Sequence, residues 1–196
     1  MSTGLMILVI AAAVVVFGIT IYNRLIALRN RVRNGFAQID VQLTRRHDLI
    51  PNLVEAVKGY MQYEKETLQA VIEARNTAVS GLKAAAVDPS NAEAIRQLGI
   101  AEAGLGSALG RLFALSEAYP DLQASQNMMQ FQEELASTEN KVSFARQAFN
   151  DAVQVYNTAR ESFPSNLVAK AFGFEAARFL EIESDQHREV PQVSFR

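Results

Sequence analysis

The first 23 residues carry no charged side chain, and the stretch LMILVIAAAVVVFGITIY at residues 5–22 is almost wholly apolar. A helix needs about 20 such residues to cross the hydrocarbon core of a bilayer. The pattern therefore predicts a transmembrane anchor over residues 1–23. A cleaved signal peptide is the alternative. It is disfavoured because no basic residue precedes the apolar run, which passes directly into helical sequence.

Beyond the anchor, apolar residues recur at spacings of three and four, as they do along one face of an α-helix. The pattern predicts long helices and one short helix over residues 23–47, 49–80, 91–117, 122–162 and 165–171. The helix over 122–162 keeps a near-heptad spacing, which is typical of coiled-coil packing. The predicted fold class is all-α: a transmembrane helix followed by an elongated antiparallel bundle over residues 24–162.

Prolines predict two joints between these helices. Asp48 is a good N-cap residue and Pro51 disfavours helical geometry at the residue before it, so the first joint is predicted at Asp48 and Pro51. Whether the helices on either side form a hairpin or one kinked rod stays open. Tyr119 and Pro120 predict the second joint, ahead of the helix over 122–162.

Residues 163–196 form a third region, which is rich in Phe and ends in an extended tail, EVPQVSF, with alternating apolar residues. The region either folds back over the end of the bundle or presents an apolar edge to a neighbouring subunit or the membrane. The candidate residues of such an edge are Phe163, Phe172, Phe174 and Phe179.

Glycines are concentrated in the helix predicted over residues 91–117, at Gly99, Gly104, Gly106 and Gly110. In an exposed helix each would cost about 1 kcal/mol relative to Ala. Either the helix is poorly formed, or another helix approaches this face closely. The second interpretation makes these glycines a candidate surface for self-association.

The net charge of −2 hides an asymmetry. Six Arg against one acid give residues 1–47 a charge of +5, whereas 13 Lys and Arg against 20 Asp and Glu give the remainder −7. Because basic residues mark the cytoplasmic end of a membrane span, the body is expected in the cytoplasm and the N-terminus outside. The Arg side chains either bind anionic lipid heads or only set this topology. The residues predicted at the membrane interface are Tyr22, Arg24, Arg29, Arg31 and Arg33.

The sequence offers little for catalysis. It has no Cys, and it lacks a Gly-rich phosphate loop and the common hydrolase and metal-binding motifs. His47 and Asp48 are adjacent, so in a helix their side chains point about 100° apart and chelate one ion poorly. No catalytic residue, metal or cofactor is predicted, and the acidic body disfavours nucleic-acid binding.

Four stretches, at residues 22–32, 38–76, 119–157 and 163–174, together with the closing PQVSF, resemble the LemA family of bacterial membrane proteins. The resemblance implies a membrane-anchored, mostly helical protein with a short outside N-terminus, a cytoplasmic body and no established catalytic activity. Tyr63 stands where the family usually has a His, which further weakens a histidine-based site.

The expected function is that of a non-enzymatic, single-pass protein of the bacterial cytoplasmic (inner) membrane, whose helical body self-associates or scaffolds partners. The expected partners are the lipid bilayer, further copies of the chain and a membrane protein. One alternative is a monomeric adaptor or sensor for a membrane protease or signalling kinase. A remote alternative is a metal-dependent hydrolase that uses His47 and Asp48.

Overall fold

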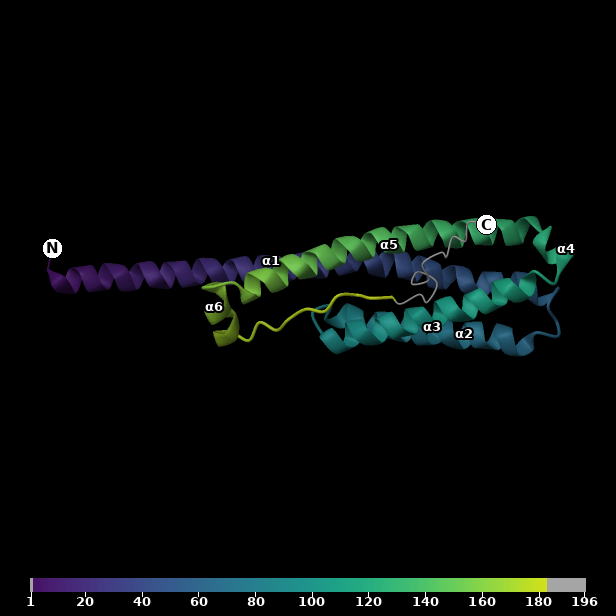
Figure 1. The fold of residues 1–196 in the computed structure, drawn as a ribbon, viewed down its shortest axis with the longest axis horizontal. Helices are drawn as coiled ribbons and strands as arrows, with labels where there is room; N and C mark the ends of the chain where they lie inside the picture. Colours follow the sequence, from purple (N-terminus) through teal and green to yellow (C-terminus); the bar gives the residue numbers. More distant parts are fainter. Residues whose placement is uncertain (1, 183–196) are drawn as a thin grey trace, which may run out of the picture.

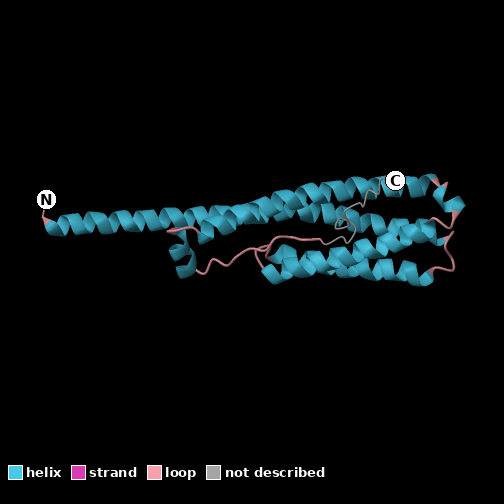
Figure 2. Ribbon diagram, viewed as in Figure 1, coloured by secondary structure: helices cyan, strands magenta, loops and turns pink. Residues whose placement is uncertain are grey.

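The computed structural model describes residues 2–182 of the chain, and the extended tail predicted near the C-terminus lies outside them. All regular structure in this part of the chain is helical (Figure 2). The elements are α1 (Thr3–Lys58), α2 (Lys65–Val87), α3 (Ala92–Ser116), α4 (Pro120–Gln123), α5 (Gln126–Glu161) and α6 (Ser165–Ala171). The prediction of an all-α fold is confirmed.

The first helix, α1, contains 56 residues and therefore spans about 84 Å. Its apolar side chains up to Phe17 are exposed, and the first buried one is Ile21. Figure 1 shows this N-terminal part projecting beyond all the other helices. An 18-residue stretch of α1, of which 6% is buried, is long and apolar enough to cross a membrane. A stretch of α3 is also long and apolar enough, but 39% of it is buried inside the body.

The break between helices predicted at Asp48 and Pro51 is absent, because both residues lie inside α1, and of the two arrangements left open there the chain forms a single rod. The helix continues to Lys58, and the chain turns only between Gly59 and Glu64. In place of the helices predicted over 23–47 and 49–80, α1 runs on to Lys58, and α2 begins only at Lys65. The loss of one backbone donor at Pro51 is offset by a contact from α2, described below.

Helix α1 packs along α5 and α2, and α2 packs along α3 (Figure 1). The buried apolar side chains fall into two separate clusters. The proximal cluster, nearer the projecting part of α1, includes Leu25, Val32, Phe36, Leu43, Leu98, Val142, Phe149 and Tyr156. The distal cluster includes Ile50, Leu53, Val57, Val71, Leu105, Leu112, Leu122 and Leu135.

The two turns at the distal end of the body are tied together. Tyr119 precedes α4 as its N-cap residue and Pro120 begins it, so both lie where the chain turns from α3 to α5. The Tyr119 hydroxyl donates a hydrogen bond to Glu64 Oε1 at 3.2 Å, in the turn between α1 and α2. Burial, and then the charge of the Glu64 carboxylate, raise the pKa of Tyr119.

After α6 the chain returns as an extended segment, residues 173–182, which is held against α5 by two asparagines. Asn157 accepts from the Ala177 N–H at 3.0 Å and donates to its carbonyl at 2.8 Å. Asn150 makes the same pair of bonds with Leu180, at 2.9 and 3.3 Å. The two asparagines are seven residues apart, which places them on one face of the helix.

This extended segment changes the interpretation of two predicted surface residues. Phe174 is buried in the proximal cluster, so the prediction that it belongs to an exposed edge is wrong. A side chain at Gly99 would collide with the carbonyl oxygen of Glu181. Gly99 is therefore required by the close approach of the extended segment rather than of another helix.

Candidate functional site: a buried polar layer

A layer of polar side chains separates the proximal and distal clusters. Along α1, Arg46 and His47 lie between the buried Leu43 and Ile50, and along α3, Glu102 lies between the buried Leu98 and Leu105. We define the polar layer by its contacts as Arg46, His47, Arg75, Glu102 and Glu139. All four long helices contribute to it.

Glu102 is the centre of the polar layer. Its side chain is completely buried, and His47 and Arg46 are 2% and 7% exposed. His47 Nε2 donates to Glu102 Oε1 at 2.7 Å, and Arg46 lies 3.4 Å from Oε2. Arg46 also pairs, at 3.0 Å, with Glu139, and the Glu139 carboxylate is half-exposed. A buried carboxylate is tolerated only when it is paired and hydrogen-bonded, and here both of its oxygens are engaged.

Arg75 of α2 connects the polar layer to the proline in α1. In a regular helix the N–H of residue 51 would bond to the carbonyl of His47, but proline has no N–H. Arg75 Nε supplies the missing donor at 3.2 Å from the His47 oxygen. The Arg75 guanidinium also lies 3.8 Å from the Asp48 carboxylate. This contact explains how α1 passes through Pro51 without ending.

We expect Arg75→Leu to lower the free energy of unfolding by about 1–3 kcal/mol, because it leaves the His47 carbonyl without a donor. In a Pro51→Ala background, Arg75→Leu should lower the free energy of unfolding by less, because alanine at position 51 restores the helical N–H that bonds to the His47 carbonyl. Urea unfolding of the four proteins, followed by circular dichroism, measures the coupling. Equal costs in both backgrounds would contradict this role for Arg75.

The contacts of the layer bear on the hydrolase alternative. His47 pairs with Glu102, whereas Asp48 faces Arg75 and its side chain is 70% exposed, so the supposed His47–Asp48 pair is not formed. Within residues 2–182, no group of three His, Cys, Asp or Glu side chains is placed to hold a metal ion. What the arrangement can do is fix the register of the helices, because the charges are satisfied in only one alignment.

The predicted membrane-interface residues lie at the proximal end of the body, with different surroundings. Arg24 and Arg31 are exposed. Arg29 lies over the Phe174 ring at 5.3 Å, and Arg33 lies 3.7 Å from Asp88. Two of the four arginines, Arg29 and Arg33, therefore contact residues of the chain itself.

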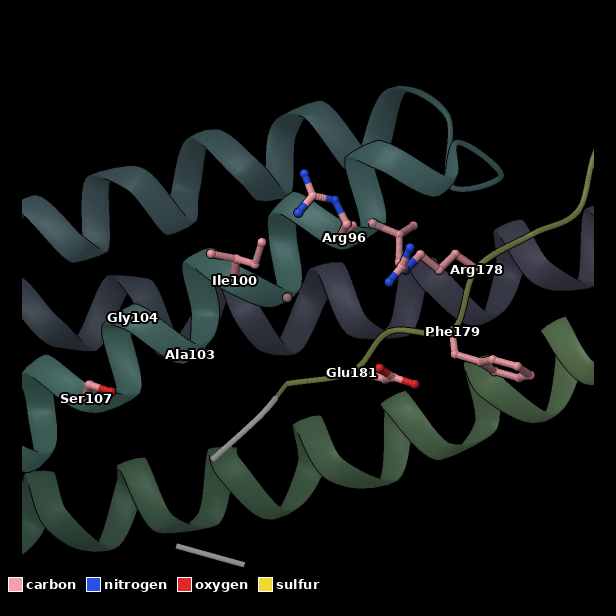
Figure 3. A pocket seen from close by; sticks show the side chains of 10 residues that line it. Arg96, Ile100, Ala103, Gly104, Ser107, Arg178, Phe179 and Glu181 are labelled. Carbon is pink, nitrogen blue, oxygen red and sulfur yellow. The ribbon is translucent and has the colours of Figure 1, made fainter. Parts of the chain in front are cut away.

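The remaining glycines of α3 face open space. A side chain added at Gly104, Gly106 or Gly110 would meet no described atom within 4 Å. Gly106 and Gly110 line a groove beside α5 that also reaches Arg46 of the polar layer. Figure 3 shows the other flank of α3, where Ile100, Gly104 and Ser107 lie beside the extended segment with Phe179 and Glu181.

The model of the LemA family matches residues 35–195 of the chain. Magnetosome protein MamQ of Magnetospirillum gryphiswaldense is 24% identical over 173 residues, which cover 81% of this chain and 64% of MamQ. Protein LemA of Metamycoplasma hominis is 26% identical over 148 residues, covering 76% of this chain and 63% of that protein. The chain thus spans slightly less than two thirds of the length of these relatives.

Proposed function

The chain belongs to the LemA family, and from this premise we propose that it is a non-enzymatic protein anchored in the bacterial cytoplasmic membrane. In this proposal the body is an antiparallel helical bundle that self-associates at the cytoplasmic face and scaffolds other proteins there. The anchor is the projecting part of α1, whose exposed apolar side chains would be unfavourable in water and favourable in lipid. The arginines that follow it support a cytoplasmic body.

The observation that carries self-association is the outward face of α3. Its exposed residues from Gln97 to Ala114 include Ile100, which is 55% exposed, and a single charged residue, Arg111. Surfaces that become the core of an interface are depleted in charge, and small side chains allow two helices to approach closely. This face is flanked by a groove on each side, which a partner's side chains can enter.

The mass of the full-length protein in mild detergent tests this proposal. We expect a discrete multiple of 21.6 kDa by light scattering after detergent correction. Ser107→Arg should shift the protein toward the monomer, because it places a charge and a long side chain on the outward face of α3. Ser143→Arg is the matched control, since Ser143 is likewise exposed, on α5.

A wild-type monomer would overturn self-association. A monomer that captures one stoichiometric membrane protease or kinase would replace it with the adaptor function. An oligomer that tolerates Ser107→Arg as well as Ser143→Arg would show that the contact surface lies away from α3.

A further inference from the structure

An exposed apolar patch remains at the proximal end of the body, around the short helix α6. Phe163, Leu167 and Phe172 are 80%, 61% and 65% exposed. Ala169 of the same helix is buried in the proximal cluster, and Val168 packs against it. The element is therefore fixed to the body by one side and presents large apolar side chains on the other.

This patch lies beside α1, at the point where the exposed apolar part of α1 ends. The rings of Phe172 and Tyr22 are in edge contact at 5.0 Å between centroids. Phe163 lines a hollow together with Phe17 and Arg24 of α1. Figure 1 shows α6 at the end of the body from which α1 projects, running across the direction of α1.

We infer that α6 and its flanking Phe163 and Phe172 form a second membrane contact, which lies in the interfacial region of the same bilayer that α1 crosses. This inference rests on the proposed anchor. The apolar patch continues the apolar surface of α1, so the bilayer that covers one reaches the other. Phe and Leu side chains form the buried face of helices that lie in the plane of the membrane interface, and α6 runs across α1 as such a helix would.

The charges around the patch suit this position. Arg24 and Lys170 are exposed beside it and can reach anionic lipid heads from the level of the patch. Three carboxylates lie nearby, at Asp151, Glu161 and Glu175. Of these, Glu161 pairs with Arg160 at 3.2 Å. The charges around the patch therefore nearly balance, and a lipid surface is favoured over a second copy of the chain because the patch adjoins the apolar part of α1.

The chain contains no Trp, so one introduced Trp reports on this patch alone. The full-length Phe172→Trp protein is reconstituted into phosphatidylcholine–phosphatidylglycerol vesicles, with and without brominated acyl chains. We expect blue-shifted emission whose intensity is at least halved by the bromines. Leu167→Trp, on the outward side of α6, provides a second reporter position and should behave in the same way.

Phe144→Trp is the matched control, because Phe144 is 73% exposed on α5. It lies 14 residues before Thr158 at the hollow, which is about 21 Å of helix. Its emission should stay water-like and unquenched.

Three outcomes separate the proposals. Failure of the protein to float with the vesicles would overturn the anchor itself. A floating protein in which both reporter positions on the patch give water-like, unquenched emission would overturn only the contact of α6. Blue-shifted emission without quenching would also overturn it, and would assign the patch to a contact between proteins.

Discussion

Glu102→Leu is expected to lower the free energy of unfolding by about 3–5 kcal/mol, the cost of removing one member of a buried ion pair. The change leaves the buried Arg46 with only the half-exposed Glu139, and it leaves His47 Nε2 without its acceptor. Urea unfolding of the body, followed by circular dichroism in detergent, measures the loss.

Glu139→Leu is the matched control for this prediction. This variant removes the other carboxylate that pairs with Arg46. Because the Glu139 side chain is 54% exposed, we expect the free energy of unfolding to fall by less than about 1 kcal/mol. Equal losses from the two variants would show that burial is not what makes the polar layer important. Replacing Arg46, His47 and Glu102 together by apolar residues should recover most of the stability, since no buried charge then remains unpaired.

The double variant Asn150→Ala, Asn157→Ala should release the extended segment from α5. It removes four hydrogen bonds to the backbone of Ala177 and Leu180, each contributing about 1 kcal/mol. We expect the amide hydrogens of these two residues to exchange about 1000-fold faster, because local opening becomes about 4 kcal/mol easier. Hydrogen exchange read by mass spectrometry on peptides from the segment measures this effect.

Asn140→Ala is the control for helix propensity, because Asn140 is exposed on the same helix. It should leave exchange in the extended segment unchanged. Unchanged exchange in the double variant would mean that burial of Phe174, Ala177 and Leu180 holds the segment without the asparagines.

Apolar periodicity is sufficient to predict the helices and much of the core. The stripe Leu25, Leu28, Val32, Phe36, Ile39 and Leu43 is buried throughout. The same periodicity fails between Gly59 and Glu64, where the chain turns although the pattern predicts a helix through it. The break that the proline predicts is absent because Arg75 supplies the missing donor, a contact that sequence spacing does not encode.

The polar layer was not predicted from the sequence, for a related reason. The nearby proline places Arg46 and His47 beside a predicted joint, although they occupy positions on the buried stripe between Leu43 and Ile50. Glu102 interrupts the stripe of α3 in the same way, between Leu98 and Leu105. A charged residue at a position where periodicity predicts an apolar one is the signal that could have found the layer. The pairing of Glu102 with a residue 55 positions away cannot be read from either stripe.

Because α1 is unbroken, the proposed membrane anchor and the body would tilt together as one rigid unit. From Tyr22 to Lys58 the helix extends about 54 Å beyond the apolar segment. A change of about 10° in its tilt, of the kind that bilayer thickness imposes, would swing the distal turns sideways by about 9 Å. The thickness of the lipid around the anchor would then determine the position of the distal turns, and hence which neighbouring proteins these turns can contact.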